Sequence, residues 1–258
     1  MTWVGHASVL IELDGTRLLT DPVLGERAGP LVRIAGGVTG GLCDDLDAVL
    51  ISHLHADHAD VPSLRRLGGA TRILAPPGAA RWLARRGLGR AEELLPGERA
   101  SVGAVQVTAT PAAHDGRRWP LGAAAAAIGF VVGGSQRCYF AGDTDLYPEM
   151  SELAGQIDLA LLPVWGWGPH VGAGHLDPAR ASAAARMIKP RVVVPIHWGT
   201  LARGWPFRRP ADPAEPARRF SRLMAVEAPS VEVRVLAPGE RTELQSAGPT
   251  VGRPARGT

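Results

Sequence analysis

The segment His53-Leu54-His55-Ala56-Asp57-His58 places four side chains that can bind a metal within six residues. The preceding run, Leu46–Ile51, is mostly apolar and is expected to form a buried strand. The cluster then lies on the loop leaving this strand, where α/β proteins usually build their sites. Imidazole and carboxylate groups suit zinc and other first-row transition metals better than magnesium or calcium. The segment therefore predicts a transition-metal site, and the alternative is a solvated His-rich turn without function.

The size and composition of the chain suit one large globular domain. Of its 258 residues, 45% are hydrophobic and 21% are charged, as in folded domains. We expect a single domain over residues 1–245 and a flexible tail over residues 246–258. The net charge of +3 permits an anionic substrate but does not demand a nucleic acid, and no aromatic-interleaved basic motif is present.

Several features indicate an intracellular protein. Cys43 and Cys138 are the only cysteines, too few for a disulfide framework, so we expect buried thiols in a reducing compartment. No secretory signal is visible at the N-terminus, and the apolar stretch 121–134 is too short and too rich in Gly and Ala for a membrane span. We predict a cytoplasmic protein without stable membrane insertion. A homo-oligomer is compatible with these features.

Apolar runs and helix signals are interspersed along the chain and show no internal repeat. The glycine-rich residues 25–45 are expected to form a loop. This mixture predicts a layered α/β domain. Strands are expected at residues 9–13, 17–20, 46–51, 72–75, 105–110, 126–132, 137–141, 159–164, 191–196 and 231–236, and helices at residues 60–67, 78–86, 177–188 and 213–225.

Further candidate ligands follow later strands. His114, Asp143 and His197 each lie just past an apolar run, so one sheet can direct all three side chains to the same edge. Each residue alone could equally be a turn residue or a packed histidine. Their shared placement predicts that they join the His53–His58 segment in one metal site.

Taken together, the motifs of this chain resemble those of the metallo-β-lactamase-fold hydrolase superfamily. The similarity runs from about residue 2 to residue 202. The opening Gly-His-Ala-Ser, the Thr-Asp-Pro, the His175-Leu176-Asp177-Pro178 and the Ile-His-Trp-Gly-Thr stretches are similar to the branch that holds bacterial L-ascorbate-6-phosphate lactonases and N-acyl phosphatidylethanolamine phospholipase D. The motifs are Trp3-Val4-Gly5-His6-Ala7-Ser8, Leu19-Thr20-Asp21-Pro22, Ile51–His58, His114, Phe140-Ala141-Gly142-Asp143-Thr144 and Pro195-Ile196-His197-Trp198-Gly199-Thr200.

The resemblance implies a four-layer αββα sandwich of the α/β class with two divalent ions at one edge. Zinc is the default ion, and manganese and iron are the alternatives, because nitrogen and oxygen ligands suit all three. By the same resemblance one ion is held by His53, His55 and His114, the second by Asp57, His58 and His197, and Asp143 bridges the two.

Such a centre implies a hydrolase that acts on a small-molecule substrate. Two ions about 3.5–4 Å apart lower the pKa of a shared water and stabilise the developing oxyanion. We expect hydrolysis of an ester, lactone, amide or phosphodiester bond. Asp57 is expected to orient the nucleophile or carry its proton, as well as to act as a ligand.

Other residues are expected to support this chemistry. His175 is expected to contact substrate or protonate a leaving group, or else only to cap the following helix. Asp21 is expected to orient a ligand imidazole or the metal loop. His6 is expected near the site, or else only to satisfy backbone groups in a strand. The loop residues Trp165 and Trp167 could wall a pocket for an apolar or ring-shaped substrate, or serve as core packing.

Two other functions compete with this interpretation. One is a nuclease-type phosphodiesterase of the same fold, although the chain has no room for the large inserted domain that such relatives often carry. The other is a non-catalytic metal-binding protein, although a degenerate relative would be expected to lose ligands and this chain keeps all seven positions.

Overall fold

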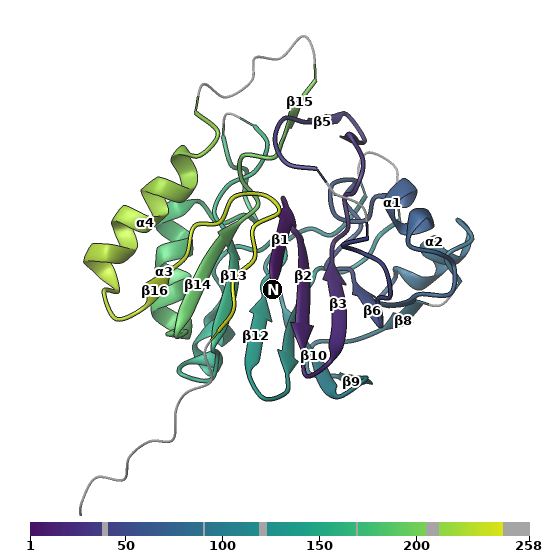
Figure 1. Cartoon of the computed structure of the whole chain (residues 1–258), viewed down its shortest axis with the longest axis horizontal. Helices are drawn as coiled ribbons and strands as arrows, with labels where there is room; N and C mark the ends of the chain where they lie inside the picture. The colour runs from purple at the N-terminus through teal and green to yellow at the C-terminus, as the bar shows by residue number, and fades with distance from the viewer. Residues whose placement is uncertain (38–40, 90, 119–122, 169, 205–211, 245–258) are drawn as a thin grey trace, which may run out of the picture.

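Two mixed β-sheets pack face to face, and helices cover both outer faces (Figure 1). This computed structural model describes residues 1–37, 41–89, 91–118, 123–168, 170–204 and 212–244; the tail expected over residues 246–258 lies outside them. The first sheet has the order β1-β2-β3-β6-β7-β8. Its strands are β1 (Thr2–Gly5), β2 (Ser8–Leu13), β3 (Thr16–Thr20), β6 (Ala48–Leu50), β7 (Arg72–Ala75) and β8 (Ala91–Glu93).

The second sheet has the order β16-β14-β13-β12-β11-β10-β9. A small third sheet, β15-β5-β4, lies near the top of the sandwich in Figure 1. The strands of these two sheets are β9 (Arg99–Val102), β10 (Val105–Pro111), β11 (Ile128–Gly133), β12 (Arg137–Phe140), β13 (Leu159–Pro163), β14 (Val192–Ile196) and β16 (Glu232–Val233), then β4 (Arg27–Ala28), β5 (Leu31–Arg33) and β15 (Leu201–Arg203).

Side chains alternate between the two faces of the first sheet, as the two-residue period of a strand requires. Leu50 and Leu74 point into the main core between the sheets. Val49 and Ile73 point the other way, into a second cluster that holds Trp82. This cluster is covered by the helices α1 (Val61–Arg66) and α2 (Ala80–Ala84).

The second sheet is covered by α3 (Pro178–Ile188) and α4 (Glu215–Glu227), which pack on β13 and β14 (Figure 1); a short 3-10 helix, Pro148–Leu153, contacts α3. Asp177 accepts a hydrogen bond from the Arg180 N–H and so caps α3, with Pro178 in the first turn. The αββα sandwich expected from the motifs is confirmed.

The direction of the strands brings the candidate ligands to one edge of the sandwich. β3, β6 and β7 are parallel to one another, and so are β12, β13 and β14. The residues that follow these strands therefore leave the sandwich together at its upper edge in Figure 1, beside the small third sheet.

The structure corrects some of the predicted elements. Residues 25–45, expected as loop, contain β4 and β5. The last strand is only Glu232–Val233 rather than 231–236, and the helix expected over 78–86 is Ala80–Ala84. Both cysteines are free and buried, as expected. Within the described part of the chain, no helix is long and apolar enough to cross a membrane.

Candidate metal centre

Four loops at the upper edge bring the predicted ligands together. The His53–His58 segment follows β6, while His114, Asp143 and His197 follow β10, β12 and β14. The ligand atoms of His53, His55 and His114 lie within 4.8 Å of one another. The same holds for a second group, which consists of His6, Asp57, His58 and His197.

Asp143 lies between these two groups. Its Oδ2 is 3.3 Å from His58 Nε2 and 4.0 Å from His53 Nε2, and its Oδ1 is 3.3 Å from His197 Nε2. One carboxylate thus approaches histidines of both groups, as a bridging ligand must.

Hydrogen bonds fix which nitrogen of each imidazole is available. The Nδ1–H of His53 donates to Ser52 Oγ (2.9 Å) and that of His58 donates to Asp21 (2.7 Å). His114 Nδ1–H donates to the Gly174 carbonyl (2.8 Å), and His197 Nδ1–H to the carbonyl of Trp165 (2.7 Å). In these four rings the Nε2 lone pair is therefore left facing the cluster.

Those nitrogens face one another in a way that suits a bound cation. His58 Nε2 is 3.1 Å from His197 Nε2, and His114 Nε2 is 3.3 Å from His55 Nδ1. Two lone pairs at such distances repel unless a proton or a metal ion lies between them. His53 Nε2 and Asp143 Oδ1 are also buried without a hydrogen-bond partner. The residues present therefore fit divalent metal ions.

Electrostatics keep most of these imidazoles in the neutral form that metals require. Burial lowers the pKa of His53 well below its ordinary value and lowers the pKa of His197 to about 3. Burial acts to raise the pKa of Asp143, but His197 and His58 outweigh it and hold this pKa well below the usual value. Burial likewise opposes charge on His58, yet Asp143, Asp21 and Asp57 raise its pKa well above the ordinary value.

Asp21 forms hydrogen bonds at both ends of the His53–His58 segment. It is fully buried at the end of β3. Its Oδ1 accepts the Ser52 N–H (2.7 Å), and its Oδ2 accepts both the Ser52 hydroxyl (2.5 Å) and His58 Nδ1–H. Asp21 thus orients His58 directly and His53 through Ser52, as expected of a carboxylate behind a metal ligand.

A tight approach of the backbone places Asp143. Gly142 has φ +61°, and a Cβ at this position would lie 2.6 Å from the Ser52 Cβ. Only glycine lets the loop after β12 approach Ser52, next to the His53–His58 segment, this closely. His6 and His197 also have positive φ angles, 54° and 65°, and the His197 N–H donates to the His6 carbonyl (2.9 Å). Backbone strain of this kind is typical of functional sites.

The Asp57 carboxylate is held by two donors. Its Oδ2 accepts the Nε2–H of His6 (3.1 Å) and the indole N–H of Trp167 (3.0 Å). Burial opposes ionisation, but His58 and the His6 hydrogen bond keep the pKa of Asp57 well below its usual value. His6, expected beside the site, therefore lies within the second group itself.

His175 lies beside Asp143 and is partly exposed. Its Nε2 is 3.3 Å from Asp143 Oδ2, and 27% of its side chain is exposed. Burial acts to lower the pKa of His175, but the hydrogen bond to Asp143 outweighs it and the pKa is raised. The ring also meets the His114 ring edge to face, at 4.6 Å between centroids.

The two predicted pocket tryptophans have different surroundings. Trp165 packs against the main core, and its indole N–H donates to the Gly168 carbonyl (3.1 Å). Trp167 packs against an apolar cluster of the small sheet. Both rings are half-buried.

Three supporting groups had not been predicted: Ser52 and the carbonyls of Trp165 and Gly174. Ser52 could have been noticed as the hydroxyl residue next to His53, but a backbone carbonyl leaves no mark in the sequence.

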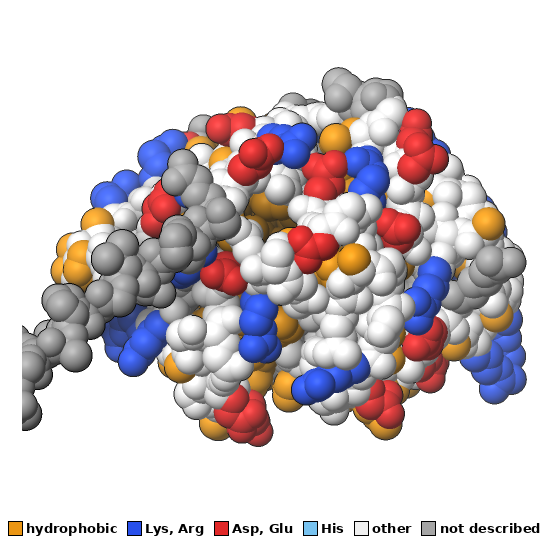
Figure 2. Space-filling view, turned by 60° about the horizontal axis from the view of Figure 1, so that its bottom comes forward, with side chains coloured by type: hydrophobic (Ala, Val, Ile, Leu, Met, Phe, Trp, Pro, Cys, Tyr) orange, Lys and Arg blue, Asp and Glu red, His pale blue; other side chains and the backbone are white. Residues whose placement is uncertain are grey.

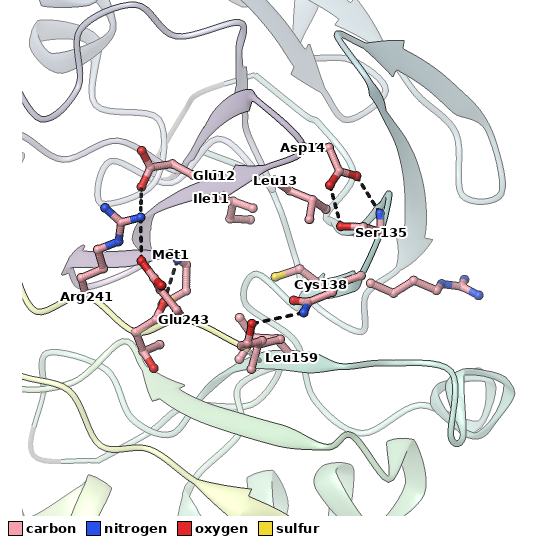
Figure 3. A pocket seen from close by; sticks show the side chains of 14 residues that line it. Met1, Ile11, Glu12, Leu13, Asp14, Ser135, Cys138, Leu159, Arg241 and Glu243 are labelled. Atoms are coloured by element: carbon pink, nitrogen blue, oxygen red, sulfur yellow. Dashed lines mark hydrogen bonds and ion pairs between the residues drawn. The ribbon is translucent and has the colours of Figure 1, made fainter. Parts of the chain in front are cut away.

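A separate cavity of about 370 Å³ lies at the opposite edge of the sandwich. Figure 2 brings the bottom of Figure 1 forward and shows basic and acidic side chains interspersed there. In the close view of Figure 3, Asp14 accepts hydrogen bonds from Ser135, and Arg241 pairs with Glu243 (2.9 Å) and Glu12 (3.9 Å). These acidic groups are engaged by Ser135 and Arg241, and no histidine among the described residues lines the cavity, so it holds no group of residues comparable with the His/Asp cluster.

Comparison with known proteins agrees with this geometry. A family model described as a beta-lactamase superfamily domain matches residues 16–198. A metal-dependent hydrolase of Methanopyrus kandleri is 32% identical over 94% of this chain and 99% of its own length. An N-acyl-phosphatidylethanolamine-hydrolyzing phospholipase D of Caenorhabditis elegans is 29% identical over 79% of this chain and 64% of its own length.

A solved structure is also similar along nearly the whole chain. The metallo hydrolase Igni18 of Ignicoccus hospitalis superposes with a TM-score of 0.67 at 26% identity, covering 93% of this chain and 95% of its own. The match to the family model spans well over half of the sequence, and it includes all seven proposed ligand positions. The chain therefore belongs to the metallo-β-lactamase-fold superfamily and is a metal-dependent hydrolase.

Proposed function

We propose that this hydrolase uses water activated between two divalent ions to cleave an ester, lactone or phosphodiester bond of a small or lipid-like substrate. The observation that carries the proposal is the pairing of imidazole lone pairs on both sides of Asp143, at 3.1 Å and 3.3 Å. Two cation positions that share one carboxylate account for both contacts.

In this proposal each ion has its own ligand set. His53, His55 and His114 would hold the first ion, Asp57, His58 and His197 would hold the second, and Asp143 would be shared by both. When bound, the ions supply an activated water and stabilise negative charge on the attacked group, with zinc as the first choice.

The chain's own residues position the reaction. Asp57 orients the attacking water; because its Oδ2 already accepts two N–H groups, we assign it to orientation rather than to proton transfer. His175 is assigned to protonate the leaving group, since its side chain is partly exposed and its Nε2 lies 3.3 Å from Asp143 Oδ2, beside the proposed ions. Asp21 and His6 keep His58 and Asp57 in place.

The bond class follows from the chemistry and the relatives. The chemistry that two such ions would supply suits a carbonyl carbon and a phosphorus atom alike. The C. elegans relative is named for cleaving a phosphodiester of a lipid, which supports including phosphodiesters and lipid-like substrates. Trp165 and Trp167, on the loop beside the site, are proposed to contact an apolar portion of the substrate.

Metal analysis and a substrate screen test the proposal. We expect elemental analysis of the purified chain to find about two ions per chain. Hydrolysis of bis-p-nitrophenyl phosphate, compared with a panel of lactones and esters, should separate phosphodiesterase from acyl hydrolase activity. Activity that survives exhaustive chelation would refute the mechanism. Two bound ions with no hydrolysis of any compound in a broad screen would instead favour a non-catalytic metal-binding protein.

A further inference from the structure

Besides the contact of His175 Nε2 with Asp143 Oδ2 (3.3 Å), the segment between β13 and α3 contacts the metal centre at three further points. The carbonyl of Trp165 receives the Nδ1–H of His197, and the carbonyl of Gly174 receives that of His114. The third contact is made by a side chain, the indole N–H of Trp167, which donates to Asp57 Oδ2 (3.0 Å). In the described part of this segment, the side chains of His175 and Trp167 therefore reach the centre directly, and Trp167 is the one that contacts Asp57.

The ring of Trp167 is anchored on the side away from the centre. It packs against an apolar cluster of the small sheet and the turn before it, formed by Val23, Ala28, Leu31 and Leu201. The guanidinium carbon of Arg203, on β15, lies 5.0 Å from the ring centroid, a cation–π distance. Because the ring is held in this way, the direction of its N–H is fixed.

The same carboxylate oxygen of Asp57 also accepts His6 Nε2–H (3.1 Å). His6 comes from the turn after β1, and Trp167 comes from the loop after β13, so the two donors approach from different sheets. Two N–H groups on one oxygen hold the carboxylate against rotation about its side-chain bonds.

We propose that Trp167 is a positioning residue that orients Asp57 for the ion held by Asp57, His58 and His197. Occupancy of that position then depends on the small sheet β15-β5-β4, which anchors the ring. The inference rests on the proposed function and adds a determinant outside the ligand set. Loss of a partner behind a metal ligand weakens metal binding by about 10–100-fold.

Cobalt binding to the metal-free full-length chain tests the role of the indole N–H. Trp167→Phe keeps an aromatic ring and removes the donor. We expect the second equivalent of Co²⁺ to bind at least about 10-fold more weakly than in the wild type, with a reduced visible absorption for that equivalent and an unchanged first equivalent. Trp82→Phe is the matched control, because its ring lies in the second core cluster, at α1 and α2, rather than beside the ligands; both equivalents should bind as in the wild type.

Two further measurements keep the result interpretable. Replacing Trp167 by 3-benzothienylalanine keeps the bicyclic ring and lacks only the N–H, so it should reproduce the weaker second equivalent even if Trp167→Phe disturbs packing. In an Asp57→Asn background, Trp167→Phe should cause no additional loss, since the effect passes through Asp57. Equal Co²⁺ affinities in the wild type and both Trp167 variants would overturn the inference. A wild-type chain that binds fewer than two equivalents would instead count against the proposed function.

Discussion

Replacing Asp21 by Asn should affect the stability of the fold and its affinity for metal, and the two effects can be measured separately. The substitution keeps the size of the side chain and removes its charge. Asp21 accepts hydrogen bonds on both oxygens, from the Ser52 N–H on one side and from the Ser52 hydroxyl and His58 on the other. An amide can accept on only one of these sides.

Either orientation of the amide carries a cost. If its NH₂ faces the Ser52 N–H, two buried donors oppose each other, which lowers the free energy of unfolding by about 1–3 kcal/mol. If its NH₂ faces His58, the ring must accept at Nδ1 and carry its proton on Nε2, the atom that faces His197 at 3.1 Å. The second outcome blocks the nitrogen that a metal would need, and we expect about 10–100-fold weaker binding at that position.

Calorimetric titration of the metal-free protein with Zn²⁺, together with thermal unfolding, would measure both effects. A loss of about 2 kcal/mol corresponds to a fall in Tm of roughly 4–8 °C for a domain of this size. Asp60→Asn is the matched control: Asp60 is also buried and accepts two hydrogen bonds from Ser63, but it contacts no histidine in the described structure, and Asn caps a helix as well as Asp does. If Asp21→Asn lowered Tm but left both Zn²⁺ affinities at wild-type values, the role assigned to Asp21 would be wrong.

Three other outcomes follow from the same geometry. His114→Ala and His197→Ala should each lower the metal content from two ions to one per chain by elemental analysis, and an unchanged content in either variant would remove that residue from its ligand set. Chelation should lower Tm and Zn²⁺ should restore it, because an ion at 100 times its Kd stabilises the folded state by about 2.7 kcal/mol; a Tm that is indifferent to both would argue against bound metal. Gly142→Ala should lower the free energy of unfolding by more than about 1 kcal/mol in urea titrations. Gly15 also has a positive φ but open space around its Cβ position, so Gly15→Ala should lower the free energy of unfolding by less than Gly142→Ala does.

The strands of the second sheet could be predicted well because burial on both faces leaves a continuous apolar signal. Val192–Ile196 and Leu159–Pro163 are fully buried, and their sequences carry few polar residues. β4 and β5 could not be predicted in the same way. They are two and three residues long, and β5 pairs with β15 across about 170 residues of sequence. Such a pairing depends on distant chain segments and leaves little local pattern.

The site shows the same division. The proposed ligands could be placed from sequence because each follows a strand, and parallel strands bring their ends to one edge. Some of the groups that orient them are harder to find, namely two backbone carbonyls and an indole N–H that reaches Asp57 from 110 residues away. Hydrogen bonds to the main chain depend on the path of a loop, which composition and periodicity do not determine.

This division has a chemical consequence for the whole centre. Strand ends determine which atoms surround the two proposed ions, while the β13–α3 segment determines the tautomer of His114 and His197 and the orientation of Asp57. The first property is built into the packed sandwich and changes only with the fold. The second belongs to a loop, which a few substitutions can reshape. Metal affinity and reactivity can therefore vary among chains that keep all seven ligand positions, because the hydrogen bonds behind the ligands are supplied by the more variable part of the structure.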